Sequence, residues 1–298
     1  MNKLKFYKRD FCPACNCKNS KNILSINKER LFRFLNFYYK KNLNELIDNY
    51  KYILKECLNC NFIYQEFVLD NLSAKFFYKY IEKQNPKNKD KFSNYEIKNI
   101  NFANYLKANY FKKEIEILDF GSGYTNYKKT NTELNFDTFD IADDNNSDMQ
   151  IKFDSLLQKK YDLIFLNQVF EHVSEPKELI IMLNNLLKKN GILKIEFPSS
   201  NMIFYRILLL KIFGFKKTLL HEIFPIEHVN CFSNTSLKIF FENFTPLKFD
   251  YELFSKDQIG MSFFKFLKYL MIKNIFIKSF FTVCTFKNGG NYFLLKKN

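Results

Sequence analysis

The sequence predicts an α/β protein: a doubly wound, mostly parallel sheet preceded by a small cysteine-rich module. Two observations predict this fold. From residue 114 onward, short apolar runs alternate with segments of helical periodicity, as in a parallel sheet with helices on both faces. Five of the seven cysteines lie within the first 62 residues. The 298 residues suffice for one such domain and an appendage, so we divide the chain into 1–62, a helical linker or cap at 63–112, and 113–298.

Short apolar runs mark the strands of the predicted sheet. They are expected at 114–120, 136–141, 148–153, 161–167 and 191–197, with two last strands at 246–254 and 291–297. Helices are expected at 175–189, where Pro176 suits the first turn, and at 233–244. Two further apolar segments predict helical lid insertions at about 200–225 and 257–287.

Charge and apolar content limit the partners of this chain. The formal net charge is +15, but the lysines are spread singly or in pairs, which favours a solvated surface over a nucleic-acid site. Seven cysteines and the lack of an apolar leader indicate a reducing, cytoplasmic location. Lys or Arg interrupts both long apolar stretches, so neither predicts a spanning helix. Aromatics mixed with lysines leave peripheral contact at the inner membrane face as an alternative. The oligomeric state is not predicted.

Polar residues stand at the ends of four successive predicted strands. The stretch EILDFGSGYTNY, residues 116–127, places two of the seven glycines on either side of a serine directly after a strand. Asp140 ends the second strand, Asp154 and Ser155 follow the third, and Asn167 ends the fourth. Ligands of open α/β sheets bind beyond the carboxyl ends of the strands, and an acid at the position of Asp140 fits a ribose. These strand ends predict a nucleotide-type cofactor site.

The order and spacing of these motifs carry a family resemblance. The runs LDFGSGYT, FDIADD, FDSL, YDLIFLNQVFEHVSEPKEL and LKKNGILKIEFP resemble the class I S-adenosylmethionine-dependent methyltransferases over about residues 95–298. The most similar subgroup has E-H-V after the fourth strand and includes sugar C- and O-methyltransferases. The missing third glycine of the dinucleotide fingerprint suits a sulfonium cofactor, which has no pyrophosphate. The resemblance implies a Rossmann-like sheet of seven strands and methyl transfer to a small-molecule or glycan-type acceptor, as in nucleotide-sugar, capsule or lipopolysaccharide biosynthesis.

The resemblance also implies which residues bind S-adenosylmethionine. The methionine part would be held by the first strand end and its turn: Asp119, Phe120, Gly121, Ser122 and Gly123. The ribose would be bound by Asp140, and the adenine end by Asp154 and Ser155. Asn167 would line the methionine side.

The three histidines of the chain all lie between residues 172 and 228, which concentrates proton chemistry near neutral pH in one region. His228, in EHVNCFS, corresponds to a segment of the resembled subgroup that borders the acceptor, so we expect it to be the general base. His172 and Glu171 are the other catalytic candidates, through hydrogen bonds to the acceptor or the cofactor. We assign His221 to a loop or lid.

Two C-x-x-C motifs predict a structural zinc site in the N-terminal module. They supply Cys12 and Cys15 from CPACNC, and Cys57 and Cys60 from CLNC. Cys17 could replace one of these ligands, and five reduced free thiols are the alternative reading. Zinc modules of this kind also precede the methyltransferase domain in sugar-modifying members of the resembled family.

Two other functions remain open from the sequence. The net charge and the zinc module would also suit an RNA methyltransferase, and a small-molecule O- or N-methyltransferase is a related alternative. Against base methylation, the turn NQVFEHV lacks the polar-Pro-Pro-aromatic sequence that grips a flipped base. The missing third glycine motivates a non-catalytic binding protein on the same fold.

Overall fold

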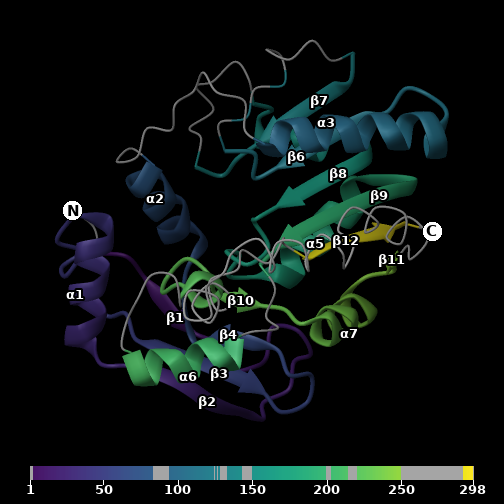
Figure 1. Ribbon diagram of the computed structural model, residues 1–298. Helices are drawn as coiled ribbons and strands as arrows, with labels where there is room; N and C mark the ends of the chain where they lie inside the picture. The colour runs from purple at the N-terminus through teal and green to yellow at the C-terminus, as the bar shows by residue number, and fades with distance from the viewer. Residues whose placement is uncertain are drawn as a thin grey trace, which may run out of the picture.

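The structure is a computed structural model that describes residues 3–82, 94–123, 125, 127, 133–142, 150–198, 203–213, 220–249 and 291–297. Three sheets form within these residues (Figure 1). The largest has the order β11 (Lys248–Phe249), β12 (Asn291–Lys296), β9 (Leu187–Phe197), β8 (Tyr161–Asn167), β6 (Glu116–Phe120), β7 (Asn135–Phe139). A second has the order β10 (Asn230–Cys231), β4 (Ile63–Gln65), β3 (Tyr52–Cys57), β2 (Ser20–Ile26). A third pairs β1 (Phe6–Lys8) with β5 (Phe67–Leu69).

The large sheet is mixed. Four neighbouring strands run parallel to one another: β7, β6, β8 and β9. Strand β12 is antiparallel to β9, and β11 is antiparallel to β12. The predicted α/β fold is confirmed, with six strands in this sheet among the described residues. The predicted strand at 161–167 is β8, and that at 291–297 is β12 apart from its last residue.

Several predicted element boundaries are wrong: β6 begins at Glu116 and not at 114, and β7 ends at Phe139 and not at 141. Phe153 begins helix α4 (Phe153–Leu157), and residues 150–152 are not a strand, although Ile151 N–H donates to Thr138 O on β7 at 2.9 Å. Asp154 and Ser155 favour the first turn of a helix and therefore shorten any strand before them. The helix expected to reach residue 189 is α5 (Pro176–Leu186), because Leu187 turns to extended backbone and opens β9.

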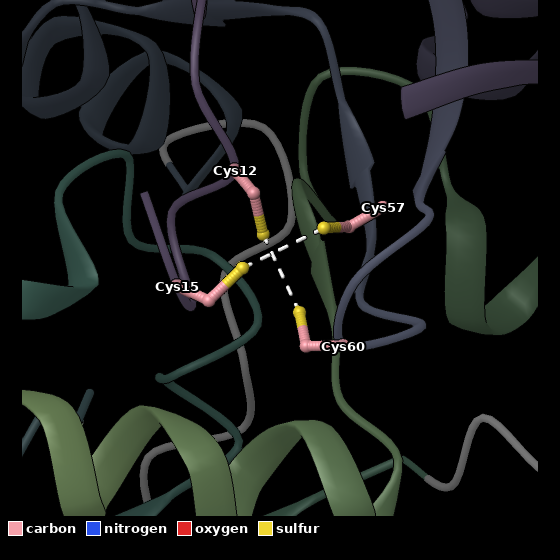
Figure 2. Close-up of side chains that lie close together, drawn as sticks. All are labelled: Cys12, Cys15, Cys57 and Cys60. Atoms are coloured by element: carbon pink, nitrogen blue, oxygen red, sulfur yellow. Dashed lines mark hydrogen bonds between the residues drawn. The ribbon is translucent and has the colours of Figure 1, made fainter. Parts of the chain in front are cut away.

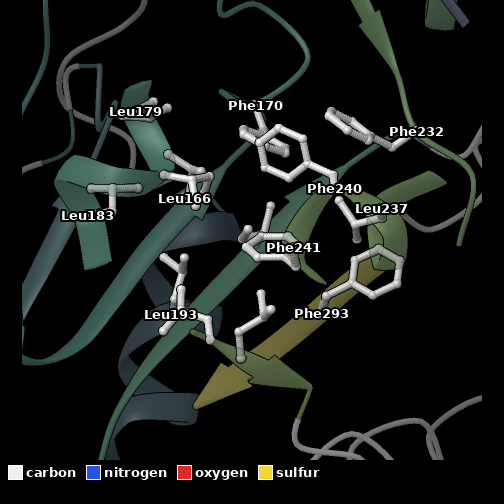
Figure 3. Close-up of a cluster of buried hydrophobic side chains, with 14 of the residues drawn as sticks. Leu166, Phe170, Leu179, Leu183, Leu193, Phe232, Leu237, Phe240, Phe241 and Phe293 are labelled. Carbon is white, nitrogen blue, oxygen red and sulfur yellow. The ribbon is translucent and has the colours of Figure 1, made fainter. Parts of the chain in front are cut away.

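Strand β8 is buried on both faces, and its residues alternate between two cores. Leu163 and Phe165 pack with helix α3 (Asn94–Leu106), which the π-helix η1 (Lys107–Phe111) continues. Ile164 and Leu166 belong to the opposite core, beneath α5 and α7 (Asn234–Phe244), as Figure 3 shows for Leu166. This period of two is the one expected of a strand covered by helices on both sides.

The N-terminal part continues into the core of the large sheet. Cys12, Cys57 and Phe62 are buried in the same cluster as Phe232 and Phe240. A separate cluster packs the four-stranded sheet against α1 (Lys28–Tyr39), α2 (Asn71–Glu82) and α6 (Ile203–Phe213). Within the first predicted insertion, α6 and the 3-10 helix η4 (His221–Ile223) are described, whereas 257–287 lies outside the described residues.

The helix predicted at 233–244 is confirmed as α7. Ser233 is its N-cap, and the Ser233 side chain accepts a bond from Ser236 N–H at 3.1 Å. Of the strand predicted at 246–254, Lys248–Phe249 is β11, and residues from 250 lie outside the described part. Among the described helices, none is both long and apolar enough to cross a membrane.

Candidate functional site

The turn after β6 requires glycine at its first position. Gly121 has φ +76°, and its N–H donates to Phe139 O at 2.7 Å. A Cβ added at Gly121 would lie 2.2 Å from Val169 Cγ2, so no side chain fits there. Gly123 also has positive φ, +59°, but a Cβ there would meet no atom within 4 Å. The turn thus packs directly on the segment that follows β8.

Asp140, at the end of β7, is held by both carboxylate oxygens. Its Oδ2 accepts from Gly123 N–H, and its Oδ1 accepts from Ala142 N–H, each at 2.8 Å. The Gln150 side chain joins the same two elements, since it donates to Gly123 O and accepts from Asp140 N–H. The two successive strand ends therefore form one cradle, as predicted from their spacing.

Asp119 is a buried acid beneath this cradle. It is 3% exposed, and its Oδ2 accepts from the Tyr127 hydroxyl at 2.7 Å. Burial raises the pKa of Asp119 from 3.8 to about 6, while the Tyr127 hydrogen bond and Lys194 oppose that rise. Asn99 of α3 donates to Tyr127 Oη at 2.8 Å and accepts from the Asn167 side chain at 3.1 Å. Two of the predicted residues, Asp119 and Asn167, are thus linked through one hydrogen-bonded chain.

The other predicted cofactor residues differ in exposure. Phe120 is partly buried against Phe139, with ring centroids 5.0 Å apart. Asp154 and Ser155 are exposed in the first turn of α4. Ser122 is buried, and Tyr124 lies outside the described residues.

Glu171, His172 and His228 come together next to the glycine turn. One carboxylate oxygen and one ring nitrogen from each histidine lie within 4.8 Å of one another. The two imidazole centroids are 4.7 Å apart, and His221 follows with its centroid 5.8 Å from that of His228. All three histidines of the chain thus lie in one cluster. The three predicted catalytic residues, Glu171, His172 and His228, lie close together in it, and their catalytic roles stay predictions.

Burial sets the charge of this cluster. The pKa of Glu171 is raised to about 8, since the carboxyl is 2% exposed and no opposite charge offsets its desolvation. The pKa of His172 is lowered to about 4, and that of His228 lies well below its usual value, both mainly by desolvation. At neutral pH both imidazoles are therefore neutral and keep a free lone pair.

Asn230 connects by hydrogen bonds the segment that carries Glu171 and His172 to the segment that carries His228. Its N–H donates to Glu171 O at 3.0 Å, and its side-chain amide donates to Phe170 O at 3.0 Å and to Val173 O at 2.7 Å. Its Oδ1 accepts from buried Arg9 at 3.0 Å. Arg9 also donates to the carbonyls of Val173 and Ser174. An asparagine from the C-terminal half and an arginine from the N-terminal module therefore fix the loop after β8.

Four cysteine sulfurs meet in the N-terminal module, as Figure 2 shows. Cys12 Sγ lies 3.6 Å from Cys60 Sγ, and Cys15 Sγ lies 3.6 Å from Cys57 Sγ. Each C-x-x-C is followed by an asparagine at positive φ, Asn16 or Asn61, whose N–H donates to the carbonyl of the first cysteine of its motif. The two motifs thus form the same turn twice and face each other.

The sequence comparison decides the family. A model described as a methyltransferase domain matches residues 94–244, just over half of the chain. The chain belongs to this methyltransferase family. It is an S-adenosylmethionine-dependent methyltransferase whose substrate the comparisons leave open.

Several solved methyltransferases are similar to this chain at low identity and low TM-score. The plantazolicin methyltransferase BpumL, in complex with a triazolic analog and S-adenosylhomocysteine, is 16% identical over 77% of this chain and 92% of that chain, with a TM-score of 0.38. The magnesium protoporphyrin IX methyltransferase from Synechocystis PCC 6803 is 13% identical over 77% and 88%, with a TM-score of 0.38. A putative sarcosine dimethylglycine methyltransferase from Galdieria sulphuraria is 13% identical over 76% and 98%, with a TM-score of 0.37. A comparison with curated proteins finds no match.

Buried polar atoms around the glycine turn of this methyltransferase fit its cofactor. Ser122 Oγ, Thr125 Oγ1 and Asn167 Oδ1 are buried and have no hydrogen-bond partner among the described residues. Buried polar groups are normally paired, so these three atoms suit a polar ligand beside the turn. The amino group of the methionine part supplies such donors, and its charge matches Asp119.

The cysteine cluster fits a tetrahedral zinc ion. Zn–S bonds of about 2.3 Å place the sulfurs of a tetrahedral site about 3.8 Å apart, close to the two separations of 3.6 Å. Cys17 does not join the four, and its sulfur instead accepts from Asn19 N–H at 3.4 Å. The choice of four ligands made from the spacing therefore agrees with the geometry.

Several residues that shape the methyltransferase site were missed from the sequence. Tyr127 stands in the stretch EILDFGSGYTNY, and Asn230 in EHVNCFS, so both lay within motifs already singled out. Asn99, Gln150 and Arg9 carried no such signal, because each acts through a partner distant in sequence.

Proposed function

We propose that this methyltransferase transfers the methyl group of S-adenosylmethionine to a hydroxyl or carbon of a sugar or glycan-type acceptor. The observation that carries the proposal is the contact between Gly121 and Val169. In this contact the turn at 120–123 lies against the segment that bears Glu171 and His172 two and three residues further on, which supports adjoining cofactor and acceptor sites. Methyl transfer is an in-line displacement, so donor and acceptor sites have to adjoin in this way.

In this proposal the cofactor-binding residues keep the roles expected from the resemblance. Asp119 and the turn at 120–123 bind the methionine part, beside Asn167. Asp140 binds the ribose, and Asp154 with Ser155 binds the adenine end from the exposed start of α4. The acid pair Asp119 and Asp140 would offset the positive charge of the cofactor.

The acceptor lies against the Glu171, His172 and His228 cluster. His228 is neutral at pH 7 and is the group we assign to take the acceptor proton, with Glu171 and His172 orienting the acceptor. Two phenols border the same region: Tyr78 Oη lies 3.1 Å from His172 Nδ1, and Tyr39 donates to Glu227. Hydroxyl, carboxyl and imidazole groups in one place support a hydroxyl-rich acceptor.

Cofactor binding tests the first half of the proposal. Isothermal titration should show saturable binding of S-adenosylmethionine and S-adenosylhomocysteine, and Gly121→Arg should abolish it. The same protein is then incubated with nucleotide sugars and surface-glycan extracts, and products are searched by mass spectrometry for the gain of one methyl group. Absence of cofactor binding, or binding that survives Gly121→Arg, would reject the proposal. Salt-dependent binding of RNA would favour the nucleic-acid alternative.

The four cysteines hold, in our proposal, a structural Zn²⁺ that stabilises the N-terminal module. A site closed by four thiolates leaves no coordination position for chemistry. Purified protein should contain one zinc per chain, and Cys57→Ser should lose it together with thermal stability. Cys17→Ser is the matched control, because that thiol stands outside the four. Zinc that persists in Cys57→Ser, or protein that folds equally well without it, would contradict the assignment.

A further inference from the structure

The cluster of Glu171, His172 and His228 has the donor set of a second metal site. Its three donor atoms lie within 4.8 Å of one another, and modest side-chain rotation would bring them to the bond lengths of about 2.0–2.2 Å that cations take from imidazole and carboxylate. Two imidazoles and one carboxylate are a common set for divalent first-row transition metals with open coordination positions. The four thiolates of the N-terminal module form a different, softer site.

Three buried polar atoms of this cluster have no hydrogen-bond partner among the described residues. Both carboxylate oxygens of Glu171 are buried and lack a hydrogen-bond partner among the described residues, as does Nδ1 of His228. The Glu171 carboxyl is 2% exposed, and its pKa is raised by burial and by the charge of Glu196 but lowered by its own backbone N–H, so its ionised form is costly unless a cation or a further donor meets it. Those orphaned acceptors all belong to the proposed ligands.

The surroundings hold the ligands in place. The Tyr78 hydroxyl meets His172 Nδ1 at 3.1 Å, which leaves Nε2 facing Glu171 Oε1 at 3.8 Å. Asn230 fixes the backbone of Glu171, and the ring of His228 bonds to the backbone of His221. A metal-ligating histidine usually donates its far ring N–H to a neighbouring acceptor, and in this site Nδ1–H of His172 would donate to Tyr78 Oη.

We propose that Glu171, His172 and His228 bind a divalent first-row transition-metal cation whose open positions face the acceptor. Its role rests on the function proposed above: a coordinated acceptor hydroxyl would lose its proton more easily, and His228 would then be a ligand and not the base. Binding of the cation itself does not depend on that function.

Manganese binding tests the proposal without an acceptor. Zinc-loaded protein, with the cysteine site filled, is titrated with Mn²⁺, and the loss of the free-ion signal is followed by electron paramagnetic resonance. Mn²⁺ prefers oxygen and nitrogen to thiolate, so it reports on this cluster alone. We expect a single saturable site per chain, weakened at least about tenfold in Glu171→Gln and in His228→Ala.

His221→Ala is the matched control, because this histidine is exposed, adjoins His228 and is not among the three ligands. It should bind Mn²⁺ as the unaltered protein does. Circular dichroism and cofactor titration verify that each variant folds, and His172→Gln replaces any variant that does not. The proposal is overturned if Mn²⁺ and Co²⁺ both fail to bind, or if binding is unchanged in Glu171→Gln and His172→Gln. Failure with intact cofactor binding would leave the proposed methyl transfer standing, with His228 as its base.

Discussion

The hydroxyl of Tyr78, on helix α2, lies 3.1 Å from Nδ1 of His172, and the two rings meet edge to face at 87°. A helix from the N-terminal half therefore sets the orientation of a residue in the cluster after β8. The tautomer of His172 depends on this bond. If the Tyr78 hydroxyl donates to Nδ1, the ring proton is on Nε2, and if the hydroxyl accepts from Nδ1–H, the ring proton is on Nδ1.

We expect Tyr78→Phe to keep the ring packing and to remove only this bond. The free energy of unfolding should fall by about 1 kcal/mol, and the ¹⁵N resonances of His172 should report an altered tautomer balance. Tyr80→Phe serves as the control on the same helix, where the ring packs against Phe76. Unchanged His172 resonances in Tyr78→Phe would mean that the bond does not form in solution.

The glycine turn gives a prediction with an internal control. Gly121→Ala has to overcome both φ +76° and a contact of 2.2 Å with Val169, so we expect a loss of about 2–3 kcal/mol and much weaker cofactor binding. Gly123→Ala meets no atom and should cost about 1 kcal/mol from its φ alone. Urea unfolding and cofactor titration measure both. Gly121→Ala combined with Val169→Ala should recover part of the loss, and equal effects of the two single changes would contradict the role of Val169.

If Asp119 binds the methionine part as proposed, cofactor affinity should depend on pH. The carboxyl is charged above its pKa of about 6, where it can pair with the ammonium group of the cofactor, and is neutral below it. Affinity for S-adenosylmethionine should therefore weaken by up to about tenfold per pH unit as the pH falls below 6. Asp119→Asn should bind weakly at every pH between 5 and 7. Titration calorimetry across this range would disprove the assignment if the unaltered protein shows no slope.

Without cofactor, the same shift acts on stability with the opposite sign. The folded pKa is raised from 3.8, so the contribution of Asp119 is fully present below about pH 3.8 and is lost as the pH rises through 6. The rise of the Asp119 pKa from 3.8 to about 6 corresponds to about 3 kcal/mol. The unfolding free energy of the unaltered protein minus that of Asp119→Asn should fall by about this amount as the pH rises across this window.

Asn230 is expected to be the most sensitive position outside the ligand-binding residues. Asn230→Ala removes the side-chain donor to the Phe170 carbonyl, one of the two donors to the Val173 carbonyl and one of the acceptors of Arg9, which should cost about 2–4 kcal/mol. Asn234→Ala, at the exposed start of α7, should change stability by less than about 0.5 kcal/mol. Chemical denaturation compares the two. A small loss in Asn230→Ala would show that loop 170–174 is held by other contacts.

Much of the sheet, and the meeting of the ends of β6 and β7, could be predicted because both follow from local patterns. The apolar residues on both faces of β8, and the polar residues that follow β6 and β7, lie within short windows of sequence. Residues 148–153 were misread because their apolar alternation suggested a strand, whereas Asp154 and Ser155 start a helix.

The hydrogen bonds between segments that lie far apart in the sequence could not be predicted. Arg9 meets Asn230 across 221 positions, and Asn99 meets Asn167 across 68. No window of sequence contains both partners, and each residue alone looks like an ordinary surface side chain. The grouping of the four cysteines was predictable over a similar distance only because thiolates in C-x-x-C pairs have one common use.

Strand β10 (Asn230–Cys231) begins two residues after His228, and it pairs with β4 of the N-terminal sheet. The pairing has a consequence for how such enzymes diversify. A lineage that exchanged its N-terminal module would also lose the strand edge with which the segment after His228 pairs. Recombination at the boundary between the two parts should therefore succeed only when β4 and residues 226–231 are inherited together, and engineered chimeras should respect the same unit.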